Sequence, residues 1–173
     1  MTHRTPTHRP LAVLLAAATL FGLLALGSPA SAARTTDATT SATRTTTRVM
    51  THNQAIVVAQ VNRARTVRDK RAISTNGLMN QKATRWAQHL VACQCLQHRA
   101  APFGVTGAWC AAAENVGRSG DNGSLRGVHD AFMRSPHHRA NILNSRWTDL
   151  GVGVARDRAG EYFVVHAFAD YRC

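Results

Sequence analysis

The stretch SPHHRANILNSRWTDLGVGV, residues 135–154, contains the start of a helix and most of a strand within twenty residues. Ser135 followed by Pro136 predicts a helix, because serine is a favoured N-cap and proline fits the first helical position. His138 then lies in the first turn. Residues 150–154 alternate aliphatic side chains with glycines, which predicts a strand.

The residues after this stretch predict the partner of that strand. Residues 161–169 are apolar on both faces, as in a central strand covered on both sides, and the turn at 156–160 makes the two strands an antiparallel hairpin. Helices before and between the strands indicate an α+β layered domain. These helices are predicted over residues 78–97, from Ser124, and from an N-cap at Asn53.

The N-terminal segment has the pattern of an export signal. A basic start precedes an apolar run at residues 11–26, and Ala-Ser-Ala at 30–32 fits a cleavage site. The alternative is a single membrane anchor, but 16 residues fall short of the roughly 20 that span a bilayer. We expect residues 1–32 to be a signal peptide and the protein to be secreted.

The segment after the predicted signal differs in composition from the remainder. Residues 33–52 consist mainly of threonine, alanine, arginine and serine, which cannot bury enough apolar surface to offset their ordering entropy. We therefore expect a disordered linker, with a glycosylated stalk as the alternative. One folded domain is predicted over residues 53–173, long enough to bury a core.

The charge of the chain limits the class of partner. Formal net charge is +12, and removal of Arg4 and Arg9 with the signal leaves 12 − 2 = +10. Such a surface favours anionic envelope polymers or lipids. Nucleic acid is not expected as the primary partner, and no second transmembrane run is present in the sequence. A basic cluster near the end of the first helix is interpreted as a solvated face: Arg63, Arg65, Arg68, Lys70 and Arg71.

Three motifs, in this order, resemble the CAP superfamily (cysteine-rich secretory proteins, antigen 5, pathogenesis-related 1). His98 resembles the histidine that follows the long helix, AENVG in a predicted loop at 113–117 resembles a GEN motif, and residues 135–154 resemble the bacterial SPGHRxNIL…GVG signature. The resemblance covers most of residues 53–169. It implies a three-layer α-β-α sandwich with a small antiparallel sheet and a cleft.

The resemblance places His98, Glu114 and His138 at three of the four His and Glu positions in the cleft of eukaryotic members. The second glutamate is absent from residues 130–135, as in many bacterial members, and His137 stands where the family usually has glycine. Two imidazoles and a carboxylate can bind Zn²⁺ through His98 and His138, or they can form a hydrogen-bonded network without metal. Both readings stay open, because no HExxH motif supports a hydrolytic zinc site.

Two further residues have simple structural explanations. Ser135 lies outside any GxSxG motif, so it is predicted to be an N-cap and not a nucleophile. His166 lies inside the last strand, where a buried, hydrogen-bonded histidine is expected more than a ligand.

Four cysteines in an exported domain predict two disulfides, and sequence alone allows three pairings. We favour Cys95–Cys110 and Cys93–Cys173, because Cys95 would share a helix face with His98 and point toward the loop that leads to Glu114. The Cys-x-Cys spacing lacks the paired Cys-x-x-Cys pattern of a structural zinc site.

These features predict a secreted, extracellular and monomeric protein that acts by binding at a site formed by His98, Glu114 and His138 and does not act by turnover. The alternative is a metal-assisted, peptidase-like hydrolase in which Glu114 is the base and the two histidines are ligands. A third interpretation is an envelope-interaction module whose cleft residues are structural.

The signal peptide generates a first prediction. Secreted protein should begin near Ala33, because the Ala-Ser-Ala sequence ends at Ala32. Intact-mass analysis of the secreted material measures this directly. Retention of residues 1–32 in that material would contradict the predicted cleavage.

Overall fold

The computed structural model describes residues 50–120 and 123–173. The predicted signal peptide and all but the last three residues of the predicted linker lie outside the described residues. Within this part of the chain, no helix combines the length and apolar character that crossing a bilayer requires.

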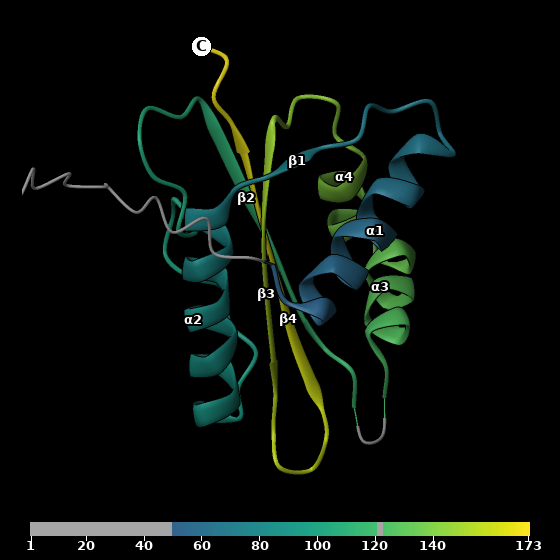
Figure 1. Ribbon diagram of the computed structural model, residues 1–173, viewed down its shortest axis with the longest axis vertical. Helices are drawn as coiled ribbons and strands as arrows, with labels where there is room; N and C mark the ends of the chain where they lie inside the picture. Colours follow the sequence, from purple (N-terminus) through teal and green to yellow (C-terminus); the bar gives the residue numbers. More distant parts are fainter. Residues whose placement is uncertain (1–49, 121–122) are drawn as a thin grey trace, which may run out of the picture. The chain divides into compact units, whose positions relative to one another are not determined.

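The described residues form three layers. The sheet has the strand order β1-β3-β4-β2, with β1 parallel to β3 and the other neighbours antiparallel. Helix α2 covers one face, and α1, α3 and α4 cover the other (Figure 1). The predicted α-β-α sandwich is thus confirmed. In chain order the elements are α1 His52–Thr66, β1 Ser74–Thr75, α2 Gly77–Cys93, β2 Ala111–Arg118, α3 Leu125–Arg134, α4 Pro136–Leu143, β3 Asp149–Arg156 and β4 Tyr162–Asp170.

Strand β4 is the centre of the sheet and is buried on both faces, as its sequence predicts. Val164 and Phe168 belong to the core under α1, α3 and α4, whereas Phe163 and Val165 belong to the core under α2. Alternate residues of a strand point to opposite faces, so a strand with helices on both sides must be apolar throughout. The predicted hairpin with β3 is also confirmed.

The glycines of the GVG motif allow α2 to approach β3 closely. A Cβ on Gly153 would lie 2.1 Å from the carbonyl oxygen of Ala83, and a Cβ on Gly151 would lie 2.5 Å from the Cβ of Met79. Neither neighbour can move without displacing the helix. Glycine at these positions therefore sets the distance between α2 and the sheet.

The close approach also satisfies the open edge of β3. Strand β1 is too short to pair beyond Leu150, so Val152 would expose its peptide groups at that edge. The amide of Asn80 accepts a hydrogen bond from Val152 N–H at 2.7 Å, and the amide of Gln54 donates to Val152 C=O at 2.7 Å. Side chains from α1 and α2 thus replace a missing strand, which covers an edge that could otherwise pair with another chain.

Two helix boundaries differ from the sequence prediction. Helix α1 is capped by Thr51, whose side chain and that of Gln54 form a capping box, so Asn53 lies inside the helix. Helix α2 ends at Cys93 and not near Gln97, because Gln94 adopts a left-handed conformation with φ 50°. Sequence periodicity did not reveal this turn, since the following residues continue to alternate apolar and polar character.

Residues 113–117 are part of β2, not a loop. Their partner is β4, in an antiparallel ladder that runs from Ala111 opposite Asp170 to Arg118 opposite Phe163. The polar residues Glu114 and Asn115 concealed the strand pattern, because both are buried through partners that only the tertiary structure supplies.

The basic cluster at the end of α1 is not uniformly solvated. Arg65 is only 1% exposed, and its guanidinium donates to the carbonyls of Arg71, Ile142 and Asn144. Two of these carbonyls lie at the C-terminal end of α4, where backbone acceptors lack intrahelical partners. The prediction of a solvated face is wrong for Arg65, which anchors α4 to α1.

The predicted disulfide pairing is wrong. The structure pairs Cys93 with Cys95 and Cys110 with Cys173, and no cysteine is free. Cys110 directly precedes β2 and Cys173 follows β4; because these strands are antiparallel neighbours, their ends meet. The left-handed turn after α2 brings Cys95 back toward Cys93, with Cα atoms 5.2 Å apart.

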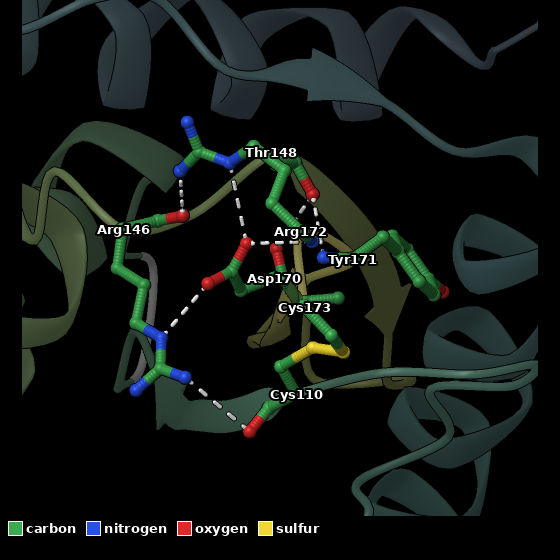
Figure 2. Close-up of a disulfide and its surroundings, with 8 residues drawn as sticks. Cys110, Arg146, Thr148, Asp170, Tyr171, Arg172 and Cys173 are labelled. Atoms are coloured by element: carbon green, nitrogen blue, oxygen red, sulfur yellow. Dashed lines mark hydrogen bonds and ion pairs between the residues drawn. A yellow bond between two sulfur atoms is a disulfide. The ribbon is translucent and has the colours of Figure 1, made fainter.

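The two bridges constrain the chain very differently. Cys110–Cys173 spans a sequence separation of 63 residues, and Cys93–Cys95 a separation of two. In the chain-entropy account, the long loop contributes about 4 kcal/mol to stability and the short one less than about 2 kcal/mol. Around the long-range bridge, Asp170 binds the guanidinium groups of Arg146 and Arg172 (Figure 2).

The close approach at Gly153 generates the second prediction. Gly153→Ala should lower the free energy of unfolding by about 1–3 kcal/mol, because the added methyl overlaps the α2 backbone. Thermal and urea denaturation followed by circular dichroism would measure the loss. Gly77→Ala is the matched control, since nothing lies within 4 Å of its Cβ position. Equal stability of the two variants would contradict this role for Gly153.

Candidate functional site

Glu114 is the buried centre of the candidate site. It lies on the edge strand β2, and its side chain is 1% exposed. Its neighbours Ala112 and Val116 pack in the cores beneath α2, so Glu114 points to the α2 side of the sheet. Burial of a carboxylate is costly without hydrogen bonds, so its partners determine its state.

Those partners come from the segment that follows α2. The Nδ1 atom of His98 lies 3.0 Å from Glu114 Oε1, and the backbone N–H of Arg99 donates to the same oxygen at 3.0 Å. His98 itself is largely exposed, with 56% of its side-chain surface accessible. The structure joins Glu114 to one of the two imidazoles, and His98 lies five residues beyond the end of α2 and not at the helix terminus.

The second oxygen of Glu114 is buried and makes no hydrogen bond within the described residues. Burial raises the pKa of Glu114, and the hydrogen bonds from Arg99 N–H and from His98 oppose this shift. Oε1 of the carboxyl group is thus fixed by hydrogen bonds, whereas Oε2 is buried without a hydrogen-bond partner among the described residues.

His138 lies in the first turn of α4, as the sequence predicts, with Ser135 at the N-cap position and Pro136 following it. The Ser135 side chain makes no capping bond, so only its position is as expected. The ring of His138 packs against Phe132 with centroids 5.0 Å apart, in the layer of α3 and α4. Burial lowers the pKa of His138, and the charges of His98 and His137 lower it further.

The structure brings His98 and Glu114 together but does not add His138 to that pair. Glu114 bonds on the α2 side of β2, while the His138 ring packs on the opposite layer. In residues 50–120 and 123–173, no three His, Cys, Asp or Glu side chains form a group that could hold a metal ion. The donors therefore do not fit the Zn²⁺ site considered from the sequence, and we derive no step through a metal.

Two amides that sequence analysis did not single out connect the motifs. Asn115 is fully buried; its Nδ2 donates to the carbonyl of His138 at 3.0 Å, and its Oδ1 accepts from Asn141 at 2.9 Å. The indole of Trp147 donates to the carbonyl of Asn141 at 2.7 Å. This network holds α4 against β2 and so places His138 near the sheet edge. The presence of one asparagine in each motif was the signal that could have revealed it.

His166 occupies the core between α3 and β4. It is buried, as expected, with Phe132 and Phe168 against its ring, but its Nδ1 makes no hydrogen bond among the described residues. Burial lowers its pKa to about 3, and the charges of His129 and His138 act in the same direction. The expected hydrogen bond is thus absent at Nδ1, and the imidazole is neutral at physiological pH.

Three surface cavities lie away from the His98–Glu114 pair. One runs between α1 and α2 beside Gln54 and Arg85, one lies between α1 and α3 beside Arg63 and His129, and the third is near Tyr162. None of the three is lined by His98, Glu114 or His138.

The sequence matches the cysteine-rich secretory protein (CAP) family over residues 58–168. A search of curated protein sequences found no match.

Solved structures share the fold at low identity. An outer surface protein from Borrelia burgdorferi is 16% identical, with 68% of this chain and 92% of that chain covered. An extracellular SCP-domain protein from Bacillus anthracis is 19% identical, with 68% of this chain and 40% of that chain covered. Venom allergen-like protein 4 from Schistosoma mansoni is 11% identical, with 70% of this chain and 90% of that chain covered. The TM-score is 0.58 in each comparison.

The buried His166 generates the third prediction. Its folded pKa of about 3 lies below the ordinary value of 6.5, so the unfolded chain binds a proton that the folded chain excludes. The stability contributed by the neutral ring is therefore present above pH 6.5 and lost as pH falls toward 3.

His166→Gln should remove this pH dependence, because an amide of similar size does not titrate. Between pH 7 and pH 4 the wild type should lose about 3 kcal/mol more unfolding free energy than the variant. Urea denaturation at several pH values would measure the difference, with the exposed His137→Gln as control. Equal acid sensitivity in both variants would refute the assignment.

Proposed function

The chain belongs to the cysteine-rich secretory protein (CAP) family, and from this premise we propose that it is an exported protein that acts by binding at the His98–Glu114 pair. The observation that carries the proposal is a buried carboxylate that holds an exposed imidazole in place. Export is supported by the apolar run at residues 11–26 and its cleavage pattern.

The pair is arranged for recognition because its exposed member has one nitrogen available. Glu114 engages Nδ1 of His98, which orients the ring, and 56% of the His98 side-chain surface stays accessible. The other ring nitrogen, Nε2, can donate a hydrogen bond to an anion when it carries a proton. His138, at the same edge of the sheet, extends the proposed binding surface.

The same geometry argues against turnover through Glu114. A general base must come within hydrogen-bonding distance of the proton that it removes. The side chain of Glu114 is 1% exposed and already accepts two hydrogen bonds on one oxygen. The hydrolase alternative requires that this carboxylate reach a water molecule or substrate, which its burial opposes.

The charge of the chain supports an anionic partner. Arginine supplies most of the positive charge, and the formal net charge is still +10 once the predicted cleavage has removed Arg4 and Arg9. Anionic envelope polymers or lipid head groups fit this surface, with binding that weakens as salt screens the interaction. Two of the similar structures are described as an outer surface protein and an extracellular protein, which agrees with action outside the cell.

Binding to defined polyanions tests the proposal. Polyphosphate and vesicles of phosphatidylglycerol with phosphatidylcholine are the probes, with pure phosphatidylcholine vesicles as the neutral control. His98→Ala should weaken binding about tenfold, because it removes the oriented donor. His52→Ala removes another exposed histidine and should leave the affinity within about twofold.

Two results would contradict this function. Equal weakening by His98→Ala and His52→Ala would show that binding follows overall charge and not the site. Hydrolysis of peptide or ester libraries by the wild type, lost in Glu114→Gln, would instead establish the hydrolase alternative. Circular dichroism of each variant verifies that the fold is intact.

A further inference from the structure

The Cys93–Cys95 bridge lies at the C-terminal end of α2, and a single residue separates its two cysteines. Cys93 is exposed, and Cys95 is half-buried against the core that contains Leu90. The bridge is thus at the protein surface, three residues before His98.

Backbone hydrogen bonds maintain this turn independently of the sulfur–sulfur bond. Gln94 is left-handed, its N–H donates to the carbonyl of Val91, and the N–H of Cys95 donates to the carbonyl of Leu90. These are the two bonds of a Schellman motif, in which an apolar contact between Cys95 and Leu90 is also expected. The side chain of Gln94 adds a bond to Val91 C=O at 2.8 Å.

Because the turn is held by its own hydrogen bonds, the two sulfur atoms remain neighbours when the bridge opens. The bridge can then close again without refolding. Reversible opening at a fixed backbone is the requirement for a disulfide that exchanges with other thiols.

Thermodynamic linkage separates this bridge from Cys110–Cys173. The fold protects a disulfide against reduction by the same free energy that the disulfide contributes to the fold. The loop closed by Cys93–Cys95 is very short, so this protection is small. Cys110–Cys173 closes a long loop between paired strand ends, beside the Asp170 network (Figure 2), so it is the more resistant bridge.

We propose that Cys93–Cys95 is a thiol–disulfide exchange site that oxidises dithiols of unfolded or partly folded peptides outside the cell. A thiolate of the peptide attacks the sulfur of Cys93, the bridge breaks, and Cys95 leaves as a thiolate that takes up a proton. The second peptide thiolate then attacks the mixed disulfide and releases Cys93, which takes up the second proton.

The exchange balances two electrons and two protons. The peptide dithiol is oxidised to a disulfide, and Cys93 and Cys95 become thiols. A low-molecular-weight disulfide such as oxidised glutathione restores the bridge by the reverse sequence. Attack at Cys93 is favoured because Cys93 is the more exposed residue of the pair.

Redox titration of the wild-type protein is the first test. The protein is equilibrated in glutathione buffers of graded ratio, alkylated, digested and analysed by mass spectrometry. The measured quantity is the ratio of squared reduced glutathione to oxidised glutathione at which each bridge is half reduced. This ratio should be at least about tenfold lower for Cys93–Cys95 than for Cys110–Cys173. Reduction of both bridges together, or of Cys110–Cys173 first, would overturn the proposal.

Oxidation of a fluorescent dithiol peptide is the second test. With oxidised glutathione present, the wild type should accelerate peptide oxidation about tenfold over the Cys93→Ser/Cys95→Ser variant. Cys110→Ser/Cys173→Ser is the matched control: below its lowered melting temperature it should retain the acceleration. Equal rates for the wild type and Cys93→Ser/Cys95→Ser would overturn the proposal, and so would loss of acceleration only in the control. Neither measurement depends on the His98–Glu114 site.

Discussion

The close packing of α2 on β3 is the contact on which the other features of the domain depend. It requires glycine at positions 151 and 153, because any side chain there would enter the α2 backbone. At this distance Asn80 reaches the peptide N–H of Val152, and the edge of the sheet is closed without another strand. The end of α2 is thereby positioned so that the following residues, His98 and Arg99, reach Glu114.

The opposite face of the sheet is organised by polar groups as well as by apolar ones. The side-chain amide of Asn115 donates to the carbonyl of His138 and accepts from Asn141. Both hydrogen bonds form at only one position of α4 against β2. Any displacement would leave a buried amide without a partner, at a cost comparable to a substantial part of a small domain's net stability. His166 represents a different solution: its ring is accommodated as a neutral group among aromatic side chains.

Two kinds of buried ionisable group therefore serve two purposes. Glu114 is raised in pKa by burial yet held by hydrogen bonds, and it orients an exposed imidazole that can meet a ligand. His166 is buried, and its lowered pKa predicts an effect on the pH range in which the fold is stable. The two disulfides also differ in their structural roles. Cys110–Cys173 joins the ends of the paired strands β2 and β4, whereas Cys93–Cys95 closes a surface turn that is already hydrogen-bonded.

The sequence by itself determined the fold class, the hairpin of β3 and β4 and the helix start at Ser135–Pro136, and the resemblance assigned His98 and Glu114 to one candidate site. These follow from local propensity, from the apolar pattern of residues 161–169, and from the resemblance carried by the motifs. Only the tertiary structure decided that Arg65 is buried, that residues 113–117 form an edge strand, and which cysteines pair. The physical reason is that the burial of polar groups and the pairing of cysteines depend on partners distant in sequence, or on a single left-handed residue such as Gln94. The apolar periodicity of the sequence carries information on neither.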